Sequence, residues 1–161
     1  MQRLLHAFRW LVVVSAGAGV TAYAAAALLT VANVIGRQVG LPISGVVDLV
    51  QLCVVGGAWL VIPYAFLTGA HVGVDLLVES MPDAVRVPLR VLASLVAIGL
   101  LILILLNCYE TFQQQMMFGD RSQQLGIPIL YYWVPLLYGV ALSAVAAALA
   151  LVPNRWVGRV E

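Results

Sequence analysis

The sequence predicts an all-α membrane protein in which four transmembrane helices form one compact bundle with short loops. Two observations carry this prediction, namely the composition and four long runs that lack charge. The 161 residues are 63% hydrophobic and only 9% charged, with a mean hydropathy of +1.04. A soluble domain is about 45–50% apolar and about 25% charged. This chain therefore lacks the polar groups that a water-exposed surface needs.

The apolar runs place the expected spans at residues 10–35, 49–70, 89–110 and 129–152, within a single domain that covers 1–161. Each run is near the ~20 residues that a spanning helix needs. Because lipid offers no hydrogen-bond partners, the backbone of such a run must be helical. Strands of a membrane barrel would alternate polar and apolar residues over about ten positions, and none of the runs does so.

The first span follows Arg3 and Arg9, and residues 10–36 contain no Asp, Glu, Lys or Arg. The apolar core of a cleaved signal peptide has about 7–15 residues, so this longer run is expected to remain as a helix. The second span follows a segment in which Gly40 and Pro42 indicate a turn.

The third span is the uncharged run 91–109, which Arg90 precedes and Glu110 follows. The fourth span carries Pro135 in its first turns, where proline costs less than at a helix centre. Two series of small residues at every fourth position predict close helix contacts. They are Ala18, Ala22 and Ala26 in the first span, and Gly139, Ser143 and Ala147 in the fourth.

The arginines predict the orientation, because cytoplasmic loops of membrane proteins carry an excess of basic residues. With both termini in the cytoplasm, only Arg37 and Arg121 lie outside. The arginines that then lie inside are Arg3, Arg9, Arg86, Arg90, Arg155 and Arg159. A membrane, crossed several times by the chain, is the expected location.

Catalytic chemistry has little support in this sequence. Cys53 and Cys108 lie inside expected spans without a CxxC pattern, and His6 and His71 are the only histidines. The sequence contains no nucleotide-binding, metalloprotease or nucleophile-elbow motif. We therefore expect no enzyme activity, no catalytic residue, no cofactor, no bound metal and no nucleic-acid partner.

Five residues are candidates for partner contacts or for structural roles, and they are Asp48, His71, Asp75, Arg86 and Arg90. His71 and Asp75 are four positions apart, so they can pair if the turn between the second and third spans is helical. Asp48 has two interpretations. It can satisfy free N–H groups at the start of its own helix, or it can pair with an arginine, either Arg37 or one on a partner subunit.

The segment "GLPISGVVDLVQLCVVGGAWLVIPYAFLTGAHVGVDLLVESMP" resembles the DctQ family, the small membrane subunit of tripartite ATP-independent periplasmic (TRAP) transporters. Asp48-Leu49 matches the family's acidic pair, and the stretch from His71 to Leu77 matches its second motif, with Pro82 shortly after. Gly69-Ala70-His71 stands where the family often has Gly-Gly-His or Gly-His. The segment "LGIPILYYWVPLLYG" is similar to the family's entry into its last span.

This resemblance implies a partner set and a function. The expected partners are a large membrane subunit with the substrate and ion sites, a periplasmic substrate-binding protein and membrane lipids. The small subunit would act as a non-catalytic scaffold in the ion-gradient-driven uptake of an organic acid. The alternative is a membrane-anchor subunit of a redox enzyme, which a visible absorption spectrum would reveal.

The orientation generates the first testable prediction. A reporter that is active only in the cytoplasm, fused after Glu161, should be active, because both termini are expected inside. Activity of a reporter that works only in the periplasm, fused at the same place, would contradict the topology.

Overall fold

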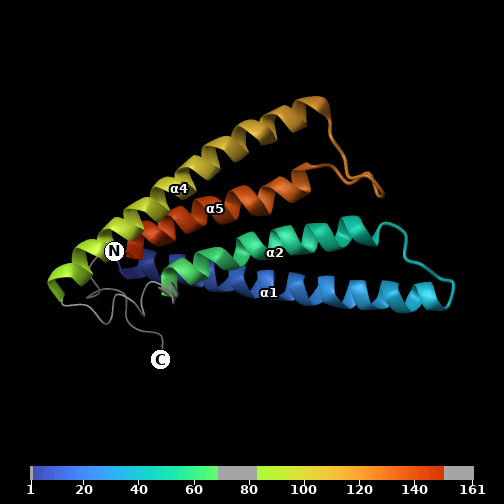
Figure 1. Ribbon diagram of the computed structural model, residues 1–161, viewed down its shortest axis with the longest axis horizontal. Coiled ribbons are helices and arrows are strands. Elements are labelled where there is room, and N and C mark those ends of the chain that lie inside the picture. Colours follow the sequence, from blue (N-terminus) through green and yellow to red (C-terminus); the bar gives the residue numbers. More distant parts are fainter. Residues whose placement is uncertain (1, 69–82, 151–161) are drawn as a thin grey trace.

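The computed structural model describes residues 2–68 and 83–150, and these form four helices (Figure 1). The helices are α1 (Gln2–Gln38), α2 (Val46–Thr68), α4 (Asp83–Phe118) and α5 (Leu130–Ala150). Each of the four is long and apolar enough to cross a membrane. Within the described ranges the only strand-like pairing is one isolated bridge between Arg121 and Pro128. The predicted all-α membrane class is confirmed.

The helices α1 and α4 are longer than the spans expected from their apolar runs. They have 37 and 36 residues, which is about 55 Å at 1.5 Å per residue, against about 30 Å for the hydrocarbon core of a bilayer. In α4 the apolar run ends at Glu110, yet the helix continues to Phe118. Glutamine, glutamate and methionine in this stretch are good helix formers, so polarity ends the apolar run without ending the helix.

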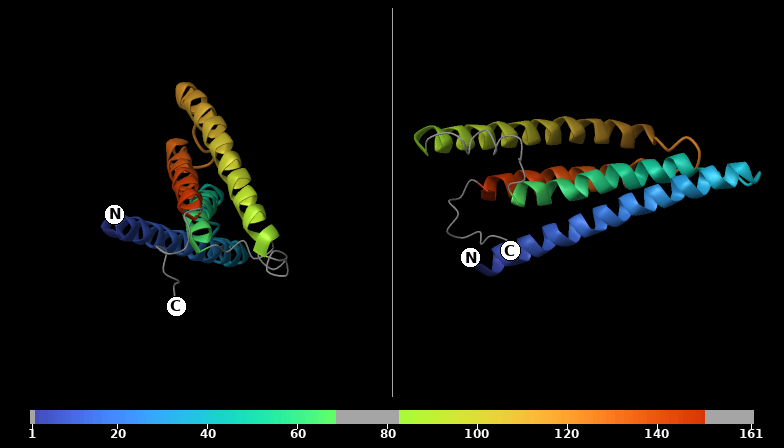
Figure 2. Two further views of the ribbon diagram at one scale, coloured as in Figure 1. Left: turned by 90° about the vertical axis from the view of Figure 1, so that its left-hand side faces the viewer. Right: turned by 60° about the horizontal axis from the view of Figure 1, so that its bottom comes forward.

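The helices pack in the order α1, α2, α5, α4, so that α2 and α5 are central and α1 and α4 form the two edges (Figures 1 and 2). This open row is less closed than a compact bundle around one axis. Residues 39–45 and 119–129 connect the helices at what we call the loop end of the row. The helix α1 begins and α5 finishes at the opposite end, which we call the terminal end.

The backbones of α1 and α2 are in direct contact where the two helices cross. A Cβ atom added to Gly19 would lie 2.7 Å from the carbonyl oxygen of Gly57, and one added to Gly57 would lie 2.9 Å from that of Gly19. Small residues allow such approaches in membrane helices. Of the predicted series, Ala26 is buried and Ala22 is half-buried, but Ala18 is wrong, because it is exposed and Gly19 makes the contact.

The contact between α2 and α5 follows the predicted series of small residues in the fourth span, which is confirmed. Gly139 lies against the backbone of Trp59, where a Cβ atom would have no room. Ser143 and Ala147 are buried on the same side of α5. The Ser143 hydroxyl donates to the carbonyl oxygen of Gly139 at 2.7 Å, so this buried polar group is satisfied within its own helix.

The helix α4 is an edge helix that packs on α5 along one stripe. Leu101 is buried against Val140 and Ala147, and Ile98 and Leu105 pack against the same cluster. Most of the remaining α4 side chains are exposed. This edge is therefore the least covered part of the described chain.

The α1–α2 crossing gives a second prediction. The Gly19→Ala variant should lose about 1–3 kcal/mol of unfolding free energy, because the added methyl group forces two backbones apart. Gly17→Ala is the matched control, since a Cβ atom at Gly17 meets nothing within 4 Å. Denaturant titration of both variants in detergent would contradict the packing if they unfolded alike.

Candidate functional site

The loop end is where the two helical hairpins meet. The first hairpin, α1–α2, turns through a short connection in which Asn33 accepts a hydrogen bond from the backbone N–H of Ile43 at 3.2 Å. Gly45, just before α2, has a φ of 76°, a value that side-chain-bearing residues rarely adopt. The side chain of Leu125 from the second hairpin lies directly over Gly45, so glycine is required here for two reasons.

The connection of the second hairpin, α4–α5, is an ordered loop with its own hydrogen bonds. The N–H of Ser122 donates to the carbonyl oxygen of Ile127 at 2.9 Å, and the N–H of Ile127 donates to the Ser122 hydroxyl at 2.9 Å. The N–H of Ile129 donates to the carbonyl oxygen of Asp120 at 3.2 Å. These bonds define the shape of the loop and leave the N–H groups at its tip available to α2.

The carboxylate of Asp48 accepts hydrogen bonds from that tip. Its Oδ2 atom accepts from the N–H of Gln124 at 2.9 Å and from the N–H of Leu125 at 2.7 Å. The side chain of Ser122 is also hydrogen-bonded to the carboxyl group. Asp48 is only 4% exposed. A carboxylate tolerates such burial only when donors surround it, and charge-assisted bonds of this kind are stronger than neutral ones.

Tyr132 makes a further bond in the same place. Its hydroxyl donates to the backbone carbonyl oxygen of Asp48 at 2.9 Å, and the side chain is 7% exposed. The start of α2 is thus held to the start of α5 as well as to the loop. Together, Asp48, Ser122, Leu125 and Tyr132 form what we call the hairpin junction.

A second group of contacts joins α4 to α5 close to the hairpin junction. The indole N–H of Trp133 donates to the side-chain oxygen of Gln115 at 2.6 Å. The ring of Phe112 lies 6.2 Å from that of Trp133, centroid to centroid, in a tilted arrangement. These contacts fix the register of α4 on α5 at the loop end.

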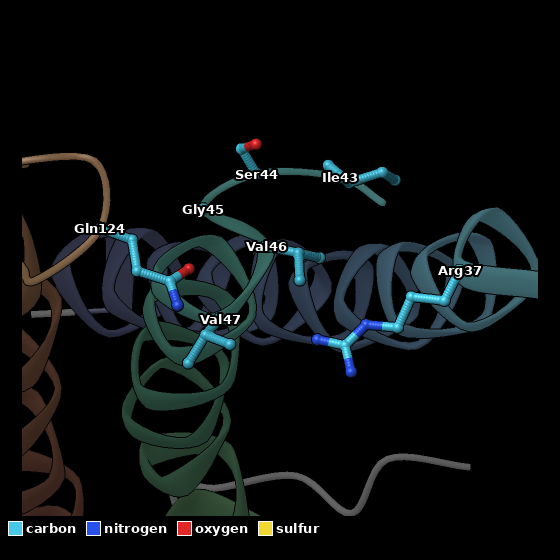
Figure 3. Close-up of a pocket in the computed structure, with 7 residues that line it drawn as sticks. All are labelled: Arg37, Ile43, Ser44, Gly45, Val46, Val47 and Gln124. Carbon is cyan, nitrogen blue, oxygen red and sulfur yellow. The ribbon is translucent and has the colours of Figure 1, made fainter. Parts of the chain in front are cut away.

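The partners of Asp48 differ from those considered from the sequence. They are backbone N–H groups 76 and 77 positions away, neither in its own helix nor on Arg37. Arg37 lies beside a shallow hollow whose walls include Ile43, Val47 and Gln124, and its guanidinium group extends back toward the start of α2 (Figure 3). An additional pairing of Asp48 with a partner subunit stays a prediction.

The other candidate residues lie away from this junction or outside the described residues. His71 and Asp75 fall between the described ranges. The backbone of Arg86 and Arg90 belongs to the first turns of α4, at the terminal end, so it is a whole span away from Asp48. Their proposed contacts remain predictions.

The hairpin junction joins helices and carries no arrangement of nucleophile and base. Its single charged group, the Asp48 carboxylate, accepts bonds from the backbone of Gln124 and Leu125 and interacts with the side chain of Ser122, which is a structural role. Sequence reasoning missed Ser122, Leu125 and Tyr132. The available signals of an ordered loop in the sequence were Gly126 and the hydroxyl of Ser122. In the structure Gly126 has a φ of 66°.

The junction predicts how the loop responds to trypsin. Asp48→Ala should increase the rate of cleavage after Arg121, because the loop tip then loses its acceptor and opens more often. Asp48→Asn should give a smaller increase, since its amide oxygen still accepts without charge. Gln124→Ala is the control, because it keeps the backbone N–H, and cleavage after Arg37 is the internal reference. Equal rates at Arg121 in all four proteins would contradict the junction.

Comparison with known proteins identifies the family. The family model described as "Tripartite ATP-independent periplasmic transporters, DctQ component" matches residues 26–155, which include the whole hairpin junction. Searches among curated proteins and among solved structures return no match. The match covers most of the chain and agrees with the four apolar helices. The chain therefore belongs to the DctQ family, the small membrane component of TRAP transporters of the bacterial inner membrane.

Proposed function

We propose that this subunit is a non-catalytic scaffold for the large membrane subunit of its transporter. The large subunit would move an organic acid, delivered by a periplasmic binding protein, at the expense of an ion gradient. The observation that carries the proposal is the hairpin junction. A buried carboxylate with donors from another hairpin resists separation of the two hairpins, and resistance to deformation is what a static support needs.

The glycine contacts support the same role at other levels of the row. Gly19 lies against Gly57 between α1 and α2, and Gly139 lies against Trp59 between α2 and α5. Closely packed backbones cannot slide or rotate without a large loss of contact, because packed interiors do not deform continuously. The Gly139–Trp59 contact therefore joins the two hairpins within the apolar region, and the Gly19–Gly57 contact joins the two helices of the first hairpin.

The polar groups buried in the described spans also favour a scaffold over a transport pathway. The hydroxyls of Ser15 and Tyr138 lie 3.0 Å apart and bond to each other across α1 and α5. Ser143 is satisfied within its own helix. An ionisable group in the membrane is the default sign of a transport pathway. The buried one here, Asp48, lies at the loop end and accepts backbone bonds.

The redox-anchor alternative has no comparable support. The DctQ match is to a transporter component, and the hairpin junction is a joint between helices. A visible absorption spectrum of the purified complex separates the two functions, since a haem-binding anchor would absorb in the visible range. We expect no such band.

Dependence on partners is the direct test of the proposed function. Liposomes that contain this chain alone should show no uptake of organic acids, because the pathway lies in the large subunit. Uptake should appear when the large subunit and the binding protein are both present, and it should collapse without an ion gradient. Gradient-driven uptake by this chain alone would refute the scaffold role. Uptake by the large subunit and binding protein without this chain, at an unchanged rate, would do so too.

A further inference from the structure

We propose that the loop-end part of α4 is the surface that contacts the large membrane subunit, and that it takes a basic or N–H-bearing side chain. This surface consists of Asn107, Glu110 and Gln114, which we call the polar α4 face. The inference rests on the proposed function, because it assumes that a large membrane subunit is bound. To the proposed function this inference adds which edge helix contacts the large subunit and which kind of side chain it binds there.

The position of these residues around the helix is the first argument. On its α5 side α4 presents Leu101, Leu105 and Phe112, which pack against that helix or its ring of Trp133. At about 100° per residue, positions 107, 110 and 114 fall on the opposite side of α4. All three are exposed. They therefore point away from the rest of the described chain.

Their depth is the second argument, and it follows from the contacts between helices. Phe112 is level with Trp133 on α5. Glu110 and Asn107 are about 3 Å and about 7.5 Å further along the helix axis toward the terminal end. Gly56 on α2 lies opposite Pro135 on α5. The level of Trp133 on α5 therefore corresponds on α2 to the apolar stretch just before Gly56. The polar α4 face is thus level with apolar parts of both central helices.

The opposite edge of the row shows how far the apolar zone extends. Since Gly19 lies against Gly57, residues near position 22 of α1 share the level of Phe112. From there α1 stays apolar and exposed at Leu28 and Ile35, which lie about 9–20 Å further toward the loop end. The α1 edge therefore stays apolar beyond the level of the polar α4 face, whose carboxylate and two amides lie closer to the terminal end.

The energetics decide the kind of partner. A charged side chain that faces hydrocarbon is costly, and such residues face protein or water and pair with other polar groups. Asn107 donates to the carbonyl oxygen of Leu103 at 2.8 Å, which occupies one of the N–H donors of its side-chain amide. Arg121, the basic residue of the adjoining loop, donates to the carbonyl oxygen of Gly126. A negative carboxylate beside amide groups is therefore complementary to a basic side chain on a neighbouring subunit.

Closer to the terminal end the same side of α4 is apolar and exposed, at Val96, Leu100 and Leu103. One side of one helix thus offers an apolar part followed by a polar part. A bilayer also passes from hydrocarbon to polar headgroups. The α1 edge, however, is still apolar beyond the level at which α4 becomes polar, so the headgroups lie further toward the loop end. This favours a helix of the large membrane subunit over lipid as the neighbour of the polar α4 face.

Site-specific photo-cross-linking in membranes that contain the whole transporter tests the placement. A photoreactive residue in place of Gln114 should give a covalent adduct with the large subunit. The same residue in place of Leu28, which is 70% exposed on the α1 edge, is the matched control and should give none. An adduct at position 28 but not at 114, or adducts with lipid alone at 114, would overturn the proposal.

Substitutions at Glu110 test the chemistry. Glu110→Lys should lower the amount of large subunit that co-purifies with this chain by about tenfold or more, because the attraction between Glu110 and a basic side chain becomes a repulsion. Glu110→Gln should lower it by less, because the attraction is only weakened. Glu110→Leu distinguishes a polar α4 face covered by protein from one covered by lipid. If the face were in lipid, leucine would leave the complex intact and raise the melting temperature of this chain, which would overturn the proposal. Amounts are normalised to the chain present in the membrane, so a failure to insert is not counted as lost binding.

The outcomes distinguish this inference from the proposed function. If the unsubstituted chain does not co-purify with the large subunit at all, the scaffold role itself fails. If the complex forms but position 114 gives no adduct with the large subunit and Glu110→Lys leaves the yield unchanged, the scaffold role stands and only the assignment of this face is overturned.

Discussion

The bonds from the N–H groups of Gln124 and Leu125 to the Asp48 carboxylate are the interaction on which the rest of the structure depends. Inside each hairpin the chain itself keeps the two helices near one another. At the loop end, contacts between side chains and backbone hold one hairpin against the other. A buried carboxylate has directional and charge-assisted bonds, so it sets the position of one hairpin on the other more narrowly than apolar contacts would. The contact of Gly139 with Trp59, further along the row between α5 and α2, agrees with that register.

The open row has a functional consequence. A closed bundle would cover all four helices, whereas this arrangement leaves α1 and α4 each with one broad uncovered side (Figure 2). In a membrane those sides must meet lipid or protein. The close contacts and hydrogen bonds between the hairpins lie in the centre, at the hairpin junction and in the α2–α5 contact. The surfaces available to partners lie at the edges, so that a partner can bind without disturbing the central contacts.

The sequence predicted the four helices because the length and apolarity of a span depend only on local composition and on the thickness of a bilayer. It predicted the Gly139 series and the burial of Ala26, but it named Ala18 where Gly19 makes the α1 contact. A four-residue spacing alone cannot decide between adjacent positions of a helix. It could not predict the partners of Asp48, which lie 76 and 77 positions away. Backbone N–H groups of a loop have no residue-specific signature.

The amide protons of Gln124 and Leu125 give the most direct measurement of the central claim. Hydrogen exchange, followed by NMR in detergent or lipid discs, reports how long each N–H stays bonded. Both amides should be strongly protected in the unsubstituted protein and should lose protection in Asp48→Ala, while the amide of Ile129, which bonds within the loop, keeps its own. Fast exchange at both positions in the unsubstituted protein, or protection that Asp48→Ala leaves unchanged, would contradict the account.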